Sequence, residues 1–150
     1  MKIRRATLED AEEITQLRAD SFERINGEEY PKELILSLKQ KNTSEILKEK
    51  LKDREMFCLV NGKEILGTVA LKGKEITSLF VKYTKVRQGI GTKLIQFIEG
   101  YARKKGIKKV FLTAAQRSKG FYLKNHYTLV KEIIKPGLVL NKNYLMEKTL

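Results

Sequence analysis

The sequence predicts an α/β protein with a mixed, mostly antiparallel sheet of about seven strands, flanked by about four helices. Three observations predict this class. Residues 56–81 hold three apolar runs separated by two glycine-containing turns, which indicates an antiparallel meander. A glycine loop at residues 86–92 then leads into a helical pattern and a further strand, which predicts a parallel strand pair. Two apolar runs, residues 127–134 and 144–149, are expected to pair as a terminal hairpin.

Helical spacing dominates the first third of the chain, after a short strand at residues 2–5. The segment Thr7-Leu8-Glu9-Asp10 resembles a capping box, so a helix is expected from there to about Arg24. The residues that follow the helical spacing are Ala11, Ile14, Leu17, Arg18 and Phe22. A second helix is expected from Pro31, and a third from a cap at Ser44.

Turn residues divide the strands of the meander. Asn61-Gly62 predicts a tight hairpin between residues 56–60 and 65–71. A second turn is expected at Lys72-Gly73-Lys74, before a strand at residues 75–81.

The second half of the chain begins its helical pattern at Ile90, and Gly106 stands where the cap at its end belongs. A strand at residues 108–113 and a short helix at residues 117–125 follow. The terminal hairpin is expected to turn at Lys135-Pro136-Gly137.

Length and composition limit the class of protein. A chain of 150 residues with 41% hydrophobic residues and two prolines predicts one globular domain, residues 1–150. No signal peptide and no run of about 20 apolar residues is present, so we expect a cytoplasmic protein with no membrane partner. Cys58 and His126 are the single cysteine and histidine, which excludes an internal disulfide and predicts no metal site.

The net charge of +13 lies entirely in the second half of the chain. Residues 76–150 carry 16 lysines and arginines against 3 acidic residues, whereas residues 1–75 are neutral. One interpretation is a polyanionic partner, either a phosphorylated cofactor or a nucleic acid. The other is a solvated basic surface. Nucleic acid is disfavoured, because the aromatic residues lie mostly at core spacing and do not alternate with the lysines as a stacking platform.

The loop Val86-Arg87-Gln88-Gly89-Ile90-Gly91-Thr92 is the most specific feature of the chain. It lies between a strand and a helix, and its two glycines allow a tight turn. Successive N–H groups can then point into one concavity at the positive end of the helix, which is a phosphate-binding arrangement.

This order of elements resembles the GNAT superfamily of acyl-CoA-dependent N-acyltransferases. The family signature Gln/Arg-x-x-Gly-x-Gly/Ala is represented by residues 86–91, with Val86 in place of its first residue. The segments at residues 67–71, 121–127 and 146–150 resemble the family's third strand, its Phe-Tyr-x-Lys-x-Gly-Phe stretch and its closing strand. The resemblance covers essentially the whole chain and is strongest to a small single-domain bacterial subgroup.

The resemblance implies an N-acetyltransferase that transfers an acetyl group from acetyl-CoA to a primary amine by direct attack in a ternary complex, without a metal. The backbone of three strand residues would pair with the pantetheine, and the amides of the loop would hold the pyrophosphate. The implied cofactor-binding residues are Leu79, Phe80, Val81, Arg87, Gln88, Gly89, Ile90, Gly91 and Thr92. Tyr122 matches the family's usual proton donor to the leaving thiolate; the alternative is an aromatic residue that only packs.

Several positions depart from the family. Ala115 stands where many members have an asparagine, and Thr113 where some have a catalytic glutamate. His126 replaces a glycine and is interpreted as a turn residue with positive φ rather than a catalytic group.

No general base is identified by the sequence. Candidate bases are Glu75 and Glu29, which are otherwise surface charges. Glu28, Glu29 and Glu33 form an acidic cluster that would attract a cationic acceptor, or simply a solvated helix start. Cations expected near the phosphates are Arg87 and Lys93, and then Arg117, Lys119 and Lys124.

Two functions therefore stay open. The first is an N-acetyltransferase acting on a small-molecule or peptide amine, as a monomer or homodimer. The second is a catalytically idle module that binds or senses acyl-CoA. Saturable cofactor binding without turnover of any amine distinguishes the second from the first.

Overall fold

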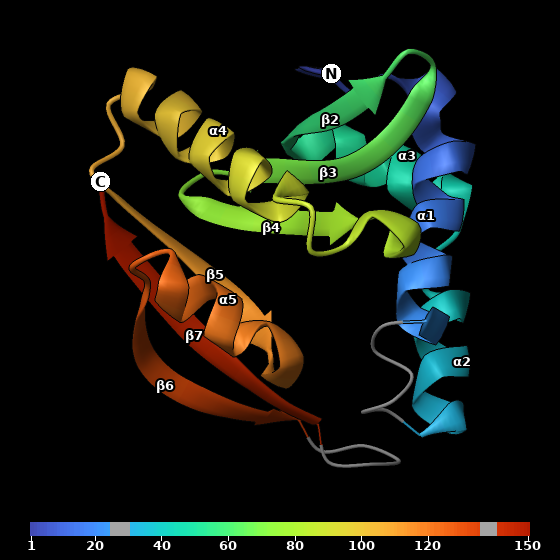
Figure 1. The fold of residues 1–150 in the computed structure, drawn as a ribbon. Helices are drawn as coiled ribbons and strands as arrows, with labels where there is room; N and C mark the ends of the chain where they lie inside the picture. The colour runs from blue at the N-terminus through green and yellow to red at the C-terminus, as the bar shows by residue number, and fades with distance from the viewer. Residues whose placement is uncertain (25–30, 136–140) are drawn as a thin grey trace.

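The computed structural model describes residues 1–24, 31–135 and 141–150. Seven strands form one sheet in the order β1-β2-β3-β4-β5-β7-β6 (Figure 1), and every neighbouring pair is antiparallel except β4 and β5. The expected fold class is confirmed. The strands are β1 (Lys2–Arg5), β2 (Glu55–Asn61), β3 (Glu64–Lys72), β4 (Glu75–Val81), β5 (Lys109–Ala115), β6 (Thr128–Lys135) and β7 (Asn141–Thr149).

Five α-helices lie in the described part of the chain, against the expectation of about four. They are α1 (Ala11–Arg24), α2 (Lys32–Gln40), α3 (Ser44–Asp53), α4 (Ile90–Lys104) and α5 (Lys119–Lys124). The expected cap at Ser44 is wrong by one residue. Thr43 is the N-cap of α3, and its Oγ1 accepts a 3.2 Å hydrogen bond from the backbone N–H of Ile46. Threonine and serine are both good caps, so the pattern did not separate the two neighbours.

The capping box expected at residues 7–10 forms and links β1 to the helix that follows. Asp10 accepts a 2.8 Å hydrogen bond from the backbone N–H of Thr7. Its two carboxylate oxygens also accept hydrogen bonds of 2.8 and 2.9 Å from the Arg4 guanidinium. These bonds, chiefly those from Arg4, hold the pKa of Asp10 below its ordinary value.

The core lies on both faces of the sheet, because alternate residues of a strand point to opposite sides. On β2, Phe57 and Leu59 pack in the cluster that contains the apolar stripe of α4. Met56, Cys58 and Val60 pack in the cluster formed with α1 and α3. The sheet is therefore a middle layer, with α4 on one face and α1 and α3 on the other.

The two central strands, β4 and β5, separate after their first residues. Their only paired position is Glu75 with Phe111, supported by a 3.1 Å hydrogen bond from Phe111 N to Lys74 O. Ser78 then adopts φ +57°, and the register between β3 and β4 shifts between Thr68 and Ala70. Such a bulge bends the strand. Figure 1 shows β4 and β5 diverging toward their carboxyl ends.

Hairpins close the two halves of the sheet. Gly62 has φ +62° in the turn between β2 and β3, as the Asn-Gly pair predicts. The terminal hairpin of β6 and β7 is also confirmed, although residues 136 and 137 of its expected turn lie outside the described residues. Strand β7 pairs with β5 along the whole length of β5, so it lies between β5 and β6.

Candidate active site

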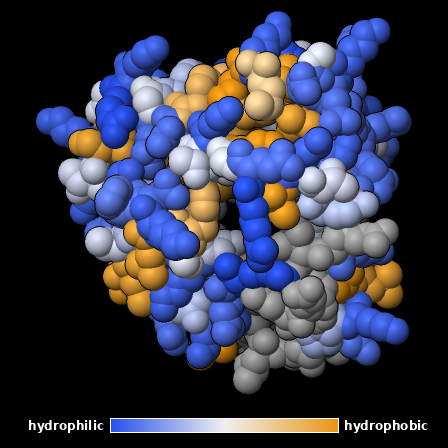
Figure 2. All heavy atoms as spheres, in the orientation of Figure 1, coloured by the Kyte–Doolittle hydropathy of each residue, from blue (hydrophilic) through white to orange (hydrophobic). Residues whose placement is uncertain are grey.

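The divergence of β4 and β5 opens a cavity of about 850 Å³. Its walls come from β4, from the loop and first turn of α4, from the end of β5, from α5 and from the face of α1. In Figure 2 the surface is hollowed near the middle of this face, with hydrophilic residues around the opening. Because elements far apart in sequence meet here, this cavity is the candidate site.

The glycine loop forms one end of the cavity. Arg87 has φ +64° and Gly89 has φ +79°, and Gly89 is the N-cap of α4. The helical ladder begins with a 3.0 Å bond from Lys93 N to Gly89 O, so the amides before Lys93 have no acceptor within the helix. The loop thus presents several N–H groups at a helix N-terminus, which is the geometry of an anion-binding nest.

The loop residues predicted to bind the cofactor divide into two groups. Arg87, Gly89, Gly91 and Thr92 line the cavity. Gln88 is exposed outside it, and Ile90 is 2% exposed with its side chain in the core. The resemblance assigned the backbone amides of these two residues, which belong to the same turn, and their side chains are not part of the cavity lining.

Strand β4 forms the long wall. Leu79, Phe80 and Val81 all line the cavity. Beyond Glu75 no described strand pairs with β4 on the side of β5, whereas β3 pairs with it on the other side. An extended ligand can therefore add to β4 as a strand would.

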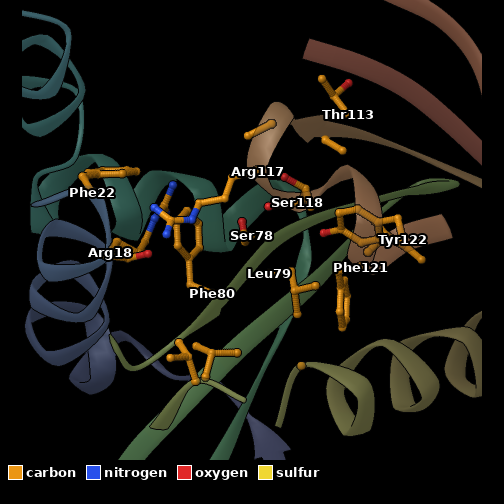
Figure 3. A pocket seen from close by; sticks show the side chains of 18 of the residues that line it. Arg18, Phe22, Ser78, Leu79, Phe80, Thr113, Arg117, Ser118, Phe121 and Tyr122 are labelled. Atoms are coloured by element: carbon orange, nitrogen blue, oxygen red, sulfur yellow. The ribbon is translucent and has the colours of Figure 1, made fainter. Parts of the chain in front are cut away.

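Tyr122 lies on the opposite wall, in α5. Its side chain is 8% exposed, and its ring packs edge-on against Phe121 and Tyr127. Figure 3 shows its hydroxyl directed toward the cavity. No hydrogen bond within the described residues uses this hydroxyl, and burial raises the pKa of Tyr122 above its ordinary value. The phenol is protonated at neutral pH and can donate its proton into the cavity.

Carboxylates are scarce around the cavity. Glu75 is the one acidic residue among the described lining residues, and it is half-buried where β4 and β5 are still paired. Thr113 and Ala115 both line the wall of β5, at the positions where the family resemblance implied a glutamate and an asparagine. Glu33 is exposed on α2, and Glu28 and Glu29 lie outside the described residues.

Only some of the cations expected near the phosphates line the cavity. Arg87 and Arg117 line the cavity, whereas Lys93, Lys119 and Lys124 do not. The Lys119 ammonium lies 4.5 Å from the centre of the Tyr144 ring. His126 has φ +71°, in keeping with its interpretation as a turn residue.

Arg18 is a charged lining residue that the sequence analysis did not assign to the site. Arg18 of α1 is 8% exposed, and its guanidinium carbon lies 4.8 Å from the centre of the Phe80 ring (Figure 3). Its Nε is buried without a hydrogen-bond partner. Burial, and then the charge of Arg54, lower the pKa of Arg18 to about 10, so the guanidinium is charged at neutral pH. The sequence did hold a signal, because Arg18 falls within the apolar spacing of its helix.

The structure also bears on metal sites and membrane-spanning segments. The described residues contain no group of three or more histidine, cysteine or acidic side chains placed to hold a metal ion. None of the helices within the described ranges is long and apolar enough to cross a membrane.

Comparison with known proteins identifies the fold. A family model described as an acetyltransferase (GNAT) domain matches residues 26–139. No curated protein matches the chain. A GCN5-related N-acetyltransferase from Rhodopseudomonas palustris is 21% identical with a TM-score of 0.91, and covers 99% of this chain and 95% of its own.

Two further solved structures are similar. The PaiA N-acetyltransferase from Thermoplasma acidophilum, in complex with coenzyme A, is 23% identical with a TM-score of 0.84, covering 99% and 98% of the two chains. A ribosomal-protein-alanine N-acetyltransferase from Brucella melitensis is 15% identical with a TM-score of 0.71, covering 100% of both. The seven-stranded sheet opened between β4 and β5, the glycine loop at the start of α4 and the family match all agree, and the chain belongs to the GNAT acetyltransferase family.

Proposed function

We propose that this protein is an N-acetyltransferase that uses acetyl-CoA and a primary amine. The observation that carries the proposal is the cavity between the diverging strands, which ends at the nest of Arg87 and Gly89. Structural neighbours of this chain include two that were solved with coenzyme A. The long cavity, the open edge of β4 and the anion nest fit three parts of acetyl-CoA, which are the thioester, the pantetheine and the pyrophosphate.

Acetyl-CoA supplies an acetyl group activated as a thioester, so that an amine nitrogen forms the new C–N bond as the C–S bond breaks. The residues of the loop bind phosphate through their amides, with Arg87 at the rim. The edge of β4 at Leu79, Phe80 and Val81 orients the chain of the ligand by backbone hydrogen bonds. Backbone N–H groups of β4 beside the thioester carbonyl would stabilise the oxyanion, at roughly 3–4 kcal/mol per donor.

Tyr122 is proposed as the proton donor to the leaving thiolate. A thiol has a pKa of about 8.5 and a tyrosine of about 10, so the transfer from phenol to thiolate is uphill by about 1.5 pKa units, or roughly 2 kcal/mol, a small cost within a reaction barrier. Burial raises the pKa of Tyr122 further and keeps the proton on the phenol until a base stronger than water forms beside it. Since a thiolate is a fair leaving group, the proton transfer accelerates the reaction without being indispensable.

The attacking amine must lose a proton. An alkyl ammonium with a pKa of about 10.4 needs roughly 4.6 kcal/mol to be neutral at pH 7. Glu75 is the one carboxylate among the described lining residues, and it is the candidate base for this proton. The cations that line the cavity also lower the pKa of a bound ammonium by charge repulsion.

A second function is supported by the scarcity of carboxylates. With Thr113 and Ala115 on the wall of β5, the cavity can also serve a module that binds acyl-CoA without turnover. The experiment that separates the two is incubation of the purified protein with acetyl-CoA and a broad panel of amines. Thiol release with an acetylated product detected by mass spectrometry supports the enzyme. Saturable acetyl-CoA binding with no thiol release from any amine supports the binding module.

A further inference from the structure

Arg18 is a charged group that the acetyl-transfer reaction, as described above, does not use. It lies in the wall of the cavity at the side formed by α1, next to Phe22 and across from Tyr122 (Figure 3). The residues that share this end of the lining are Ser21, Phe22 and Leu38. The nest at Gly89 belongs to α4, on another wall.

The guanidinium of Arg18 has no counter-ion among the described residues. The guanidinium carbon lies 4.8 Å from the centre of the Phe80 ring, and its Nε has no hydrogen-bond partner. The charged group that acts on it is Arg54, a cation, and burial and then the charge of Arg18 lower the pKa of Lys50. A cation–π contact replaces only part of the hydration that a buried guanidinium loses. Within the described part of the chain, the site is therefore short of one negative charge.

The surroundings of Arg18 explain why the fold leaves it unpaired. Asp53 also acts on Lys50, in the opposite direction to Arg18, and it is already bound by Arg54 at 2.8 Å and by Lys72 at 3.2 Å. Among the described lining residues, Arg18 and Arg87 are cations and Glu75 is the one carboxylate. A ligand that carries several positive charges would be repelled from such a lining, whereas an anionic group would be attracted.

We propose that the acceptor amine also carries a carboxylate, and that Arg18 binds this carboxylate. The inference rests on the proposed function, because it names the substrate class of the same cavity. A guanidinium offers parallel N–H donors in a planar fork, which match the two oxygens of a carboxylate. The apolar side chains of Phe22 and Leu38 at the same end suit an apolar body between the amine and the carboxylate, as in an apolar amino acid.

Phe80 connects Arg18 to the expected site of reaction. Its backbone belongs to the edge of β4 proposed to hold the pantetheine, and its ring carries the Arg18 guanidinium. A carboxylate bound by Arg18 therefore lies within a short molecule's reach of that strand edge. The amine of the same molecule is then held beside the thioester rather than free in solution, which raises the rate by proximity.

The test compares matched probes in the thiol-release assay with acetyl-CoA. The probes are leucine, phenylalanine and methionine, their amides, the amines that lack the carboxylate, and the polycations spermidine and kanamycin. We expect kcat/KM for at least one amino acid to exceed that for its amide by about tenfold or more. Preference of the wild-type protein for the amides, the simple amines or the polycations would overturn the inference while leaving the acetyltransferase intact.

Variants assign the preference to Arg18. In Arg18→Met the preference for carboxylate over amide should fall about 10- to 100-fold, mainly through KM, with acetyl-CoA affinity unchanged. Lys48→Met removes an equal charge from the exposed face of α3 and should keep the preference. Arg18→Met should also melt at or above the wild-type temperature, because an unpaired buried charge is removed.

Other results with these variants would overturn either the role of Arg18 or the proposed enzyme. An unchanged preference in Arg18→Met, or equal loss in Lys48→Met, would overturn the role of Arg18. Should Arg18→Met fail to fold, Arg18→Lys keeps the charge but loses the paired donors, and should lose part of the same preference. No binding of acetyl-CoA, or binding with no turnover of any probe, overturns the proposed enzyme itself and this inference with it.

Discussion

Gly89→Ala alters the proposed phosphate nest without filling any space in the free protein. Gly89 has φ +79°, and a Cβ added there meets no atom within 4 Å. The cost to the free protein is therefore the left-handed backbone alone, about 1 kcal/mol for alanine relative to glycine. For a chain of this size that corresponds to a fall in Tm of roughly 2–4 °C.

The effect on acetyl-CoA should be larger than the effect on stability. Relaxation of this φ turns at least one amide away from the phosphate, and one hydrogen bond to a charged group contributes about 1.5–3 kcal/mol. The dissociation constant should therefore rise about 10- to 100-fold. Calorimetric titration of acetyl-CoA measures this change, and a urea denaturation curve measures the stability.

Gly73→Ala is the matched control. Gly73 has φ +62°, and a Cβ there also meets nothing within 4 Å, but it lies in the turn between β3 and β4 rather than in the cavity lining. It should lose a similar amount of stability and keep its acetyl-CoA affinity. If both variants bind acetyl-CoA as tightly as the wild type, the loop is only a turn and the reasoning is refuted.

Three further predictions concern catalysis, packing and pH. Tyr122→Phe should lower turnover about 10- to 1,000-fold with acetyl-CoA affinity nearly unchanged, measured by thiol release; wild-type turnover would remove Tyr122 from the mechanism. Gly67→Ala should lower the free energy of unfolding by about 1–3 kcal/mol in urea, because its Cβ would lie 2.9 Å from the Phe80 carbonyl oxygen, and an unchanged midpoint would contradict this. Asp10→Asn should destabilise by about 1–2 kcal/mol at pH 7, since the carboxylate bound by Arg4 is lost. The pKa of native Asp10 lies below its ordinary 3.8, so this difference should persist above pH 4 and vanish as the pH falls through the native pKa; a difference independent of pH would exclude the carboxylate as its source.

Local chemistry explains which elements could be predicted. Asn61-Gly62 specifies its hairpin turn, and the two glycines around Ile90 specify a tight entry to α4, because few residues adopt positive φ. The alternation of Phe57 and Cys58 between the two faces of β2 follows from the same period of two that identified the strand.

Features that depend on tertiary contacts could not be predicted from the local sequence. Ser78 with φ +57° follows no local signal of the sequence, and its conformation is tied to the register shift against β3 and to a 2.8 Å hydrogen bond from Thr68 Oγ1 to its carbonyl. Arg18 fell on the apolar side of its helix, but its role depends on Phe80 and Arg54, which are brought to it only by folding. A charged residue at apolar spacing is the signal that could have identified it.

The central claim is that the cavity between β4 and β5 binds acetyl-CoA through the nest at the start of α4. The most direct measurement is the thermal melting of the purified protein with and without excess acetyl-CoA, with acetylpantetheine, which lacks the pyrophosphate, as the comparison. At a concentration about 100 times the dissociation constant, binding adds roughly 2.7 kcal/mol, which for this size raises Tm by several degrees. The account predicts that shift, and a much smaller one with acetylpantetheine. An unchanged Tm at millimolar acetyl-CoA would contradict it.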